Sequence, residues 1–547
     1  MARSISDPAS AAATGTAELD PKRWWSLAVL CMSLLIIGLD NTILNVALPS
    51  LVRELGATTS QLQWIVDGYT LVFAGLLLTA GSLGDRFGRR GALSIGLVIF
   101  GVGSAASAFA GGATALIFTR AFMGIGGALI MPATLSLLTN IFTDPKERAR
   151  AIGVWAAVAG AGSAFGPLIG GFLLEHFWWG SVFLINVPVV IVALIAGRVL
   201  LPTSRDESAP RLDPLGAVLS VAGLVVVLWG VIEGPVKGWS DTTVIAAIVG
   251  GLVLLAAFVV WELRCAHPML DVRFFKNPRF SAANGAITLV FFSMFGASFL
   301  ATQYLQTVLG FSALDAGVRM LPMALTMLVV APISPRLVER VGTKVVVGTG
   351  LLLAAAGTAV MSQIPVEDGY LVMAGGMMIM ATGMGLVMAP ATESIMGSLP
   401  PAKAGVGSAM NDTTRQMGGA LGVAILGSVL ASSYRPAVES SLTELGAPGQ
   451  VVDVAKESIG GAVQVAAELP AALGDAVARA ASEAFVSSFH STVLVASAVL
   501  CVAAAIVFKF LPARAGDPRE PVEGPLDGLA SLTFAEGEGA LEGTVEG

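Results

Sequence analysis

The sequence predicts an all-α polytopic membrane protein, in which two six-helix bundles flank two extra central helices to give fourteen transmembrane helices. Three observations support this fold class. The 547 residues are 55% apolar and 13% charged, with a mean hydropathy of +0.80, too little charge to cover a soluble protein of this size. Apolar runs of about 20 residues, long enough to cross a bilayer, recur along the chain. The N-terminal and C-terminal halves of the chain also share an internal repeat.

The fourteen predicted spans are separated mostly by short polar segments, which makes successive helices antiparallel neighbours. Their limits are 25–48, 62–80, 91–110, 114–139, 150–174, 179–201, 213–232, 243–262, 281–304, 317–338, 344–362, 371–395, 404–432 and 485–511. The predicted domains are a disordered cytoplasmic N-terminus (1–24), an N-terminal bundle (25–201), a linker with two extra helices (202–280), a C-terminal bundle (281–511) with an extracytoplasmic loop (433–484), and an acidic cytoplasmic tail (512–547).

The distribution of Lys and Arg predicts the orientation of the chain. With the N-terminus inside, 23 of these residues fall in cytoplasmic segments and 5 outside, as the positive-inside rule requires. Both termini are therefore predicted to be cytoplasmic. The abundance of Ala, Gly, Val and Arg hints at a bacterial source, so we expect the bacterial cytoplasmic membrane as the location. The loop 433–484 shows weak helical periodicity before Pro470.

An internal repeat with a spacing of about 250–260 residues relates the two bundles. The matched pairs are 131–136 with 389–394, 81–90 with 336–344, and Gly153, Gly166 and Gly170 with Gly405, Gly418 and Gly422. The two central spans match neither bundle. Six helices repeated in the same orientation are typical of transporters that hold their substrate between the halves.

Composition excludes several other classes of protein. Much of the net charge of −7 lies in the tail, so nucleic-acid binding has no support. The three cysteines suggest no disulfide framework. Three histidines without metal-ligand spacing, and the lack of a Walker-type phosphate loop, argue against an enzyme, a metal site or an ATP-driven pump. We expect no cofactor, with a proton gradient as the energy source, and a monomer whose partners are the lipid bilayer and small hydrophobic or cationic substrates.

The most charged stretch between two apolar runs is Gly81-Ser-Leu-Gly-Asp-Arg-Phe-Gly-Arg-Arg90. Four charged residues cannot lie in hydrocarbon, so we expect a short loop between two buried helices. Gly84 and Gly88 would allow a tight turn. The charged members are Asp85, Arg86, Arg89 and Arg90, which could pair with acids or lipid phosphates.

This stretch resembles the signature loop between spans two and three of the major facilitator superfamily. Four further stretches resemble motifs of its fourteen-span drug:proton antiporter branch: 39–49 in span one, 120–128 in span four, 153–171 in span five and 411–419 in span thirteen. The resemblance covers about residues 25–433 and the last span. It implies the major facilitator fold, multidrug efflux, and a role for the Gly81–Arg90 loop as a cytoplasmic latch or gate. The simpler interpretation is that this loop only fixes the orientation of the chain in the membrane through its basic residues.

Three buried charges are candidates for proton coupling. Asp40 lies well inside span one, where an ionised carboxylate costs roughly 2.5–3.5 kcal/mol, so it must be protonated, paired or hydrated. Arg120 cannot be neutralised by losing a proton and needs a partner, for which Asp40 and Asp67 are both candidates. The resemblance makes Arg120 a participant in a proton relay. Plain helix-packing bonds, or an interfacial Asp67 hydrated from outside, remain open alternatives.

The span-five motif carries the resemblance to exporters. Its members are Gly153, Gly162, Gly166, Pro167, Gly170 and Gly171. Small residues let membrane helices approach closely, and a proline permits a bend. We expect the neighbour of this face to lie across the interface between the bundles. Ordinary small-residue packing is the alternative.

The candidate substrate cavity rests on stripes of apolar and polar side chains. Its candidate residues are Trp155, Phe295, Phe299, Gln303, Met380, Met384, Glu393, Asp412 and Arg415. Methionine suits promiscuous surfaces, and aromatic walls suit lipophilic cations. Core packing is the favoured interpretation of the methionines. Asp412 and Arg415 could simply pair with each other, and Glu393 could reach water rather than act at a gate.

Together these features predict a proton-coupled antiporter that exports hydrophobic or cationic drugs by alternating access. The alternative is a dedicated exporter of one endogenous metabolite, antibiotic or lipid with the same coupling. A broad resistance profile would favour the first, and protection against one chemical class the second.

Overall fold

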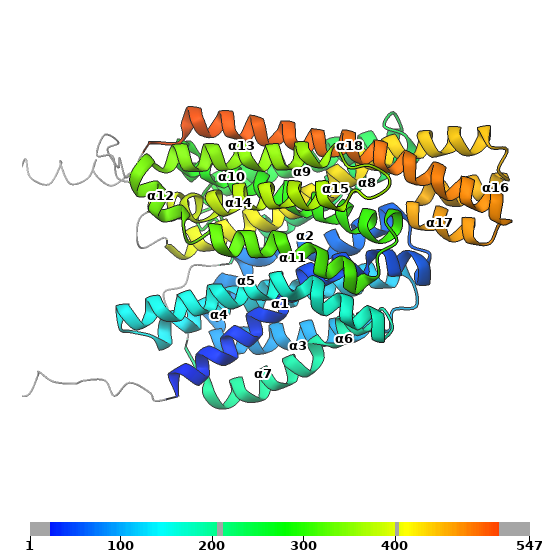
Figure 1. The fold of residues 1–547 in the computed structure, drawn as a ribbon. Coiled ribbons are helices and arrows are strands. Elements are labelled where there is room, and N and C mark those ends of the chain that lie inside the picture. The colour runs from blue at the N-terminus through cyan, green and yellow to red at the C-terminus, as the bar shows by residue number, and fades with distance from the viewer. Residues whose placement is uncertain (1–21, 205–211, 400–403, 514–547) are drawn as a thin grey trace, which may run out of the picture.

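The computed structural model describes residues 22–204, 212–399 and 404–513. Within these ranges the protein consists of helices without a β-strand, which confirms the predicted all-α class (Figure 1). The two predicted disordered tails lie almost entirely outside the described residues. Thirteen described helices are long and apolar enough to cross a membrane. The predicted fifth span falls on α5, which contains side chains outside the described set, so the count of fourteen stays a prediction.

The helices fall into three groups along the chain. The N-terminal group is α1 (Arg23–Leu55), α2 (Thr59–Phe87), α3 (Arg89–Ala108), α4 (Ala113–Ile141), α5 (Pro145–His176), α6 (Ser181–Leu184) and α7 (Asn186–Leu200). The insert is α8 (Pro214–Lys237), α9 (Thr242–Arg264) and the short η2 (Val272–Lys276). The C-terminal group is α10 (Pro278–Gln303), the π-helix η3 (Tyr304–Val308), α11 (Ala313–Val330), α12 (Ser334–Val341), α13 (Thr343–Met361), α14 (Tyr370–Gly397), α15 (Ala404–Glu444), α16 (Gly449–Glu457), α17 (Ile459–Ala467) and α18 (Ala471–Phe510).

Several helix starts follow directly from local sequence. Thr58 forms a capping box with Gln61 at the start of α2, which satisfies two backbone N–H groups. Asp144 and Asn277 cap helices whose first residue is proline, where a missing N–H costs nothing. Asp241 caps α9, and hydrogen bonds from the hydroxyl and N–H of Thr243 hold the pKa of its carboxyl below the usual value.

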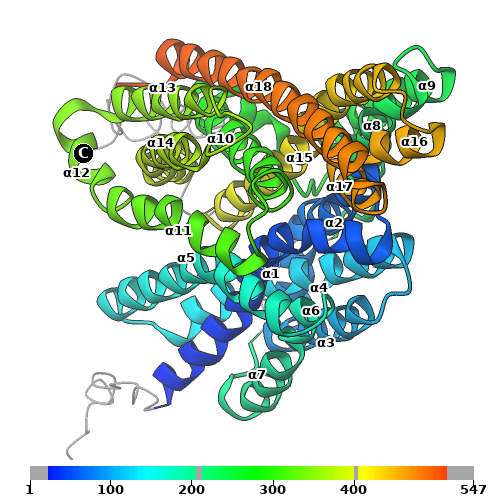
Figure 2. The same cartoon turned by 45° about the vertical axis from the view of Figure 1, so that its right-hand side comes forward.

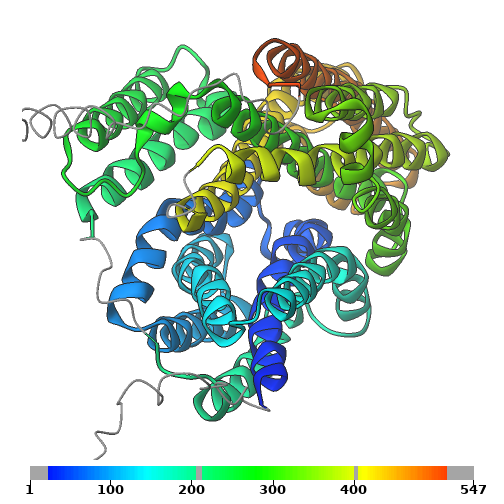
Figure 3. The ribbon, with the colours of Figure 1, turned by 90° about the vertical axis from the view of Figure 1, so that its left-hand side faces the viewer.

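The two ends of the bundle are named here by the turns on either side of α2. The Gly56 end is where α1 passes into α2, and the Gly88 end is where α2 passes into α3. Figure 3 views the molecule from the Gly88 end, with the N-terminal group in blue and cyan below the C-terminal group. The inserted helices α8 and α9 pair with each other, and α8 also contacts α2 and α15.

Repeated glycine contacts support the predicted repeat at the level of atoms. A Cβ on Gly96 of α3 would lie 2.9 Å from the carbonyl oxygen of Gly126 in α4, and a Cβ on Gly350 of α13 would lie 2.8 Å from that of Gly383 in α14. Such distances require glycine at both positions. The α3–α4 contact is therefore repeated in α13–α14 at the predicted spacing.

The prediction of a loop at 81–90 is wrong in one respect. Helix α2 continues to Phe87 and α3 begins at Arg89, so Gly88 alone separates them. Gly88 has φ +118° and Gly342, before α13, has φ +88°, so the repeat preserves this turn. Gly84 is helical and lies close to α3, with its Cβ position 3.3 Å from the Cβ of Ala92. The chain turns sharply here because glycine tolerates a positive φ.

Replacing Gly88 by alanine is expected to destabilise the protein by about 1–3 kcal/mol, since alanine is strained at this φ. Gly91→Ala in α3 is the matched control, because no atom lies within 4 Å of its Cβ position and alanine favours the helix. Thermal unfolding of the two purified variants in detergent checks this. Equal stabilities would show that the turn does not depend on the conformation of Gly88.

The segment 433–484, predicted as an outer loop with weak helical periodicity, is helical for most of its length. Helix α15 runs to Glu444, α16 and α17 follow, and α18 starts directly after Pro470, so the weak periodicity before this proline does mark helices. We call residues 433–484 the helical cap. It projects at the Gly56 end, where α16 and α17 lie at the right of Figure 1.

Polar contacts hold the helical cap together and tie it to the N-terminal group. The Tyr434 hydroxyl donates to the Ala455 carbonyl at 3.0 Å, and Arg435 pairs with Glu457 at 3.2 Å. The Thr59 hydroxyl, at the start of α2, donates to the Glu457 carbonyl at 2.7 Å. The cap belongs to the C-terminal group, and its bond to Thr59 also connects it to the N-terminal group.

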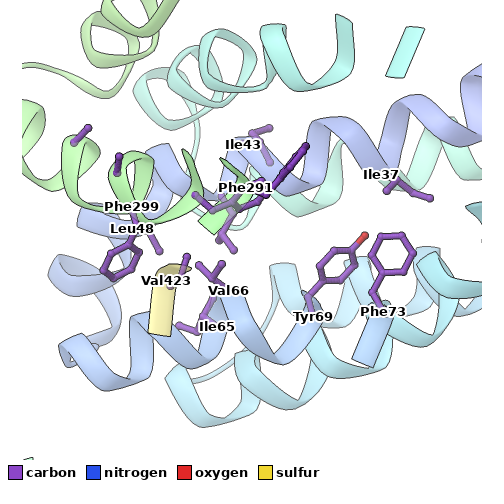
Figure 4. Packing of buried hydrophobic residues seen from close by; sticks show 14 of the residues in the cluster. Ile37, Ile43, Leu48, Ile65, Val66, Tyr69, Phe73, Phe291, Phe299 and Val423 are labelled. Carbon is purple, nitrogen blue, oxygen red and sulfur yellow. The ribbon is translucent and has the colours of Figure 1, made fainter. Parts of the chain in front are cut away.

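A single large apolar core runs through both groups of helices. Figure 4 shows Ile43, Val66 and Tyr69 from the N-terminal group together with Phe291 and Val423 from the C-terminal group. Burial of such side chains stabilises each by roughly 1.5–3 kcal/mol relative to water. Because lipid is itself apolar, close packing and polar contacts must hold the helices together within the membrane.

Candidate functional site: a buried ion pair beside the interface of the two halves

Asp40 and Arg120 form an ion pair inside the N-terminal half. The Arg120 guanidinium donates from Nη1 to Asp40 Oδ2 at 2.5 Å. Asp40 is 0% exposed and Arg120 is 1% exposed. The pair joins α1 to α4, and it decides between the two carboxylates that the sequence left open as partners of Arg120. Removing one member of such a pair leaves a charge buried without compensation.

The rest of the Arg120 side chain is enclosed by a carbonyl and two aromatic rings. Its Nε donates to the Ile65 carbonyl of α2 at 3.2 Å. The guanidinium carbon lies 4.4 Å from the ring centre of Tyr69 and 5.8 Å from that of Phe183. Aromatic faces attract cations, most strongly where water is absent. Arg120 thus has favourable contacts even without the negative charge of Asp40, as a proton relay would need.

Asp67 is separate from this pair. It is 0% exposed, and neither carboxylate oxygen has a hydrogen-bond partner among the described residues. It lies one helical turn after Gln63, so both occupy the same face of α2. The side chain of Gln63 donates to the carbonyls of Val423 and Ala424 in α15. Asp67 therefore lies on the face of α2 that is turned toward the interface between the halves, and its side chain is buried.

The contacts that join the two halves gather at the Gly56 end. Besides Gln63 with α15, the Gln306 side chain of η3 donates to the Val46 carbonyl of α1 at 2.8 Å. Helix α5 packs on α11 (Figure 2). Among the described residues, no hydrogen bond or ion pair joins the halves at the Gly88 end. The structure is closed between the halves at the Gly56 end.

The span-five glycines divide between two neighbours, which corrects the predicted placement. A Cβ on Gly162, Gly166 or Gly170 would collide with α1, in the same half. Gly171 instead faces α11 of the other half, where its Cβ would lie 2.5 Å from Leu314 Cα, and the Pro167 carbonyl lies against Gly317. Gly153 is exposed, and its Cβ position has no atom within 4 Å. Only part of the motif lies at the interface.

The packing of Gly166 and Gly170 on α1 also recurs in the second half. Gly418 and Gly422 of α15 lie against Thr288 and Phe292 of α10 in the same way. The contact between α1 and α5 is therefore repeated between α10 and α15. Gly405, the predicted counterpart of Gly153, lies at the start of α15 where side chains are outside the described set.

The methionines proposed for a substrate cavity are packed inside the protein. Met380 and Met384 are each 1% exposed. The backbone of Met380 lies against Gly357 of α13, just as Met123 of α4 lies against Gly103 of α3. The repeat assigns Met380 to helix packing, which is the alternative that the sequence left open.

The predicted aromatic stripe on α10 is buried as well. Phe295 packs against Gly419 of α15, and Phe299 is 0% exposed. The Gln303 amide donates to the Phe299 carbonyl at 3.3 Å and borders a cavity of about 10 Å³ beneath the helical cap. A space of this size holds at most one water, so it is too small for a drug.

The remaining polar candidates lie farther toward the Gly88 end. Arg415 Nη1 and Asp412 Oδ1 are 4.0 Å apart, so the two residues pair within α15. Arg415 also reaches the Thr392 hydroxyl of α14 at 3.4 Å. Glu393 is exposed. The Trp155 indole donates to the Thr134 hydroxyl of α4 at 3.3 Å, which places it against its own half.

The comparison with known families decides the identity of the fold. The family model of the Major Facilitator Superfamily matches residues 30–423 of this chain. The chain belongs to this superfamily. Superfamily members are transporters rather than enzymes in the catalytic sense.

The superfamily relatives most similar to this chain include drug and antibiotic exporters. The multidrug efflux pump LfrA of Mycolicibacterium smegmatis is 38% identical, over 90% of this chain and 97% of its own. The tetracenomycin C resistance and export protein of Streptomyces glaucescens is 34% identical, over 95% of this chain and 97% of its own length. The methyl viologen resistance protein SmvA of Salmonella typhimurium is 34% identical, over 90% of this chain and 99% of its own length. These relatives support an exporter role.

Solved structures of distant superfamily transporters share the fold. A bacterial homologue of the human lysosomal transporter Spinster, in an inward-facing and unoccupied conformation, superposes with a TM-score of 0.60 at 17% identity, covering 90% of this chain and 99% of that one. An auto-inhibited POT family peptide transporter gives 0.59 at 18% identity, covering 90% and 99%. At this level of identity the comparison concerns the fold alone.

The signature loop of the superfamily makes its contacts within the N-terminal half. Asp85 pairs with Arg89 at 2.7 Å, Arg90 donates to the Leu201 carbonyl at 3.1 Å, and the Arg89 N–H donates to the Ser204 carbonyl at 3.0 Å. The Arg86 guanidinium lies 5.7 Å from the ring centre of Phe87. Gly81 packs against Pro132 of α4. The Gly88 end is thus not latched to the C-terminal half in this conformation.

Sequence reasoning missed Tyr69 and Phe183, whose rings lie against the Arg120 guanidinium. The two aromatic residues resemble ordinary core residues in the sequence, because nothing local shows that their rings face Arg120. No group of three His, Cys, Asp or Glu residues among those described could hold a metal ion.

Proposed function

We propose that the protein is a proton-coupled antiporter that exports hydrophobic or cationic drugs across the bacterial cytoplasmic membrane. The observation that carries this proposal is the Asp40–Arg120 pair, with both members almost fully buried. A carboxylate is the only member of the pair that can take up and release a proton near neutral pH. A buried ionisable residue within the membrane is a functional site by default.

The proposed cycle uses protonation of Asp40 to change the balance between two conformations. Deprotonated Asp40 binds Arg120 and ties α1 to α4. Protonation removes the negative charge and weakens this tie, while Ile65, Tyr69 and Phe183 continue to hold the guanidinium. Protonation while the Gly56 end is open then favours closure at that end and opening at the Gly88 end, where the proton is released. The deprotonated protein binds substrate there and carries it back to the Gly56 end. Asp67 is the proposed second coupling group, because it is buried at the interface and neither of its carboxylate oxygens has a hydrogen-bond partner in the described part of the chain.

The proposed orientation places the Gly88 end and both termini in the cytoplasm. The basic residues of the Gly81–Arg90 stretch and the start of α1 support this assignment through the positive-inside rule. The helical cap then lies outside the cell. The protein acts as a monomer with no cofactor, and the proton gradient supplies the energy.

The substrate class is proposed from the relatives. The names of LfrA and SmvA refer to multidrug efflux and to methyl viologen, an organic dication. The second candidate is a dedicated exporter of one compound, which the tetracenomycin C and cephamycin export proteins favour. Fold and coupling would be the same in both cases.

Ethidium uptake into proteoliposomes tests the proposed function. An acid-inside pH gradient is expected to drive ethidium inward, and an ionophore that collapses the gradient is expected to stop it. A panel of dyes and antibiotics separates the two candidates, because competition by chemically unrelated cations favours the multidrug exporter. Uptake that ignores the gradient would contradict proton coupling.

A further inference from the structure

Gln63 of α2 crosses the interface between the halves near the Gly56 end. Its side chain is 1% exposed. The amide nitrogen Nε2 donates to the carbonyls of Val423 and Ala424 in α15 at 3.1 and 2.9 Å, and the Ser428 hydroxyl lies 3.5 Å away. A buried amide is unfavourable unless it is hydrogen bonded. Each of these three partners of the amide nitrogen belongs to the opposite half.

Helix α15 has a notch that accommodates this amide. A Cβ on Gly427 would lie 2.5 Å from Gln63 Nε2 and 2.9 Å from Gln63 Cδ, which is closer than such atoms can approach. Because glycine has no Cβ, it allows another group to come close to the backbone. Gly427 therefore lets the Gln63 amide reach the carbonyls of α15.

Gln306 makes a matching contact in the opposite direction. It belongs to η3, at the end of α10, and its side chain donates to the Val46 carbonyl of α1 at 2.8 Å. Helix η3 is a π-helix, in which the N–H of Leu309 donates to the carbonyl of Tyr304 at 3.0 Å. Such turns are rare and occur frequently at functional sites. One amide from each half thus binds the backbone of the other half.

Both contacts can form and break without disrupting a helix. The acceptors are carbonyls within α15 and α1, and a carbonyl has two lone pairs, so it can accept the glutamine in addition to a helical N–H. When the halves separate, the freed amide can bond to water instead. The net effect of one neutral hydrogen bond is then modest, a factor of about 2 to 10 in an equilibrium constant.

We propose that Gln63 and Gln306 are the gating residues of the Gly56 end. Their hydrogen bonds hold the halves together there and break when the halves separate, so they set the ratio of open to closed molecules at this end. Gly427 is a positioning residue that gives the Gln63 amide its place. The inference rests on the proposed function, because only alternating access requires this end to open.

The distance between the halves at the Gly56 end tests the proposal. Spin labels are attached through Glu54→Cys, next to the turn between α1 and α2, and Glu367→Cys, between α13 and α14, since both glutamates are exposed. Pulsed electron resonance then measures the distribution of distances between the labels in proteoliposomes without a pH gradient. The native cysteines are first replaced by alanine, at positions Cys31, Cys265 and Cys501.

Gln63→Met and Gln306→Met keep the approximate size of each side chain but remove its donor. Each is expected to raise the ratio of long to short distances about 2- to 10-fold, as follows from the loss of a hydrogen bond that exists only in the closed state. A wild-type distribution of distances in either variant would overturn the proposal.

Gln303→Met is the matched control on the same helix as Gln306. Gln303 is 4% exposed and donates to the Phe299 carbonyl of its own helix at 3.3 Å, a bond that separation of the halves does not break. Its replacement is expected to leave the distribution of distances unchanged. A shift as large as that of the two gating variants would contradict a specific role for the contacts between the halves.

Gly427→Ala tests the notch separately. Its new methyl group is expected to displace the Gln63 amide and to shift the distances in the same direction as Gln63→Met. In a Gln63→Ala background the same substitution is expected to have no further effect, and a further shift there would show that the notch does not act through Gln63. If Gln63→Met fails to fold, Gln306→Met and Gly427→Ala decide. Because no pH gradient is used, a failure of the proposed proton coupling would appear in the ethidium assay and not in these distances.

Discussion

Replacing Arg120 by methionine is expected to destabilise the protein by about 3–5 kcal/mol and to abolish ethidium transport driven by a pH gradient. The substitution leaves the Asp40 carboxylate buried without its cation, and losing one partner of a buried pair has a cost of this size. The second effect follows because Asp40 can no longer alternate between a paired and a protonated state. Thermal unfolding and proteoliposome uptake measure the two effects separately.

A double variant separates the structural role of the pair from its role in coupling. Arg120→Met combined with Asp40→Leu replaces the buried pair by apolar side chains, which is often nearly neutral for stability. We therefore expect much of the lost stability to return while gradient-driven transport stays absent. Wild-type uptake by Arg120→Met would show that the pair is only a static tie between α1 and α4.

Replacing Gly171 by alanine is expected to disrupt the closed interface at the Gly56 end. The new Cβ would lie 2.5 Å from Leu314 Cα and 2.6 Å from the Ala313 carbonyl oxygen. Both are backbone atoms, so α11 must move as a whole. Overpacking of this kind costs about 1–3 kcal/mol, and here the cost falls on the contact between the two halves. We expect reduced thermal stability and slower ethidium transport.

Gly153→Ala is the matched control within the same motif. No atom lies within 4 Å of its Cβ position, and alanine favours a helix over glycine. Its stability and transport are expected to equal or exceed those of the wild type. Equal losses in both variants would mean that the motif acts through backbone flexibility rather than through close approach at the interface.

Helix positions could be predicted because membrane burial leaves a strong local signal. An apolar run of about 20 residues must satisfy its own backbone hydrogen bonds, and a helix does so. Span ends were less certain, and α1, α2 and α15 extend several residues beyond the predicted limits. Helices can continue into the interface region, where hydropathy falls but backbone hydrogen bonding persists.

The role of a glycine could be predicted where it depends on the glycine's own backbone conformation. It could not be predicted where it depends on which helix the glycine packs against. The turn at Gly88 follows from the properties of glycine itself. By contrast, the assignment of Gly162, Gly166 and Gly170 to the interface was wrong, because they pack on α1. Spacing identifies one face of a helix but does not say which helix it meets.

The sequence by itself determined that this protein is an all-helical membrane protein with a six-helix repeat and with charged residues inside its apolar runs at Asp40, Asp67 and Arg120. These properties follow from hydropathy, periodicity and residue chemistry, each of which is local or recurs along the chain. Tertiary structure alone decided that Arg120 of α4 pairs with Asp40 rather than Asp67, and that the Asn186 side chain of α7 donates to the Ser104 hydroxyl of α3. These contacts join residues 80 or more positions apart, so they depend on how the helices pack and leave no trace in any single segment.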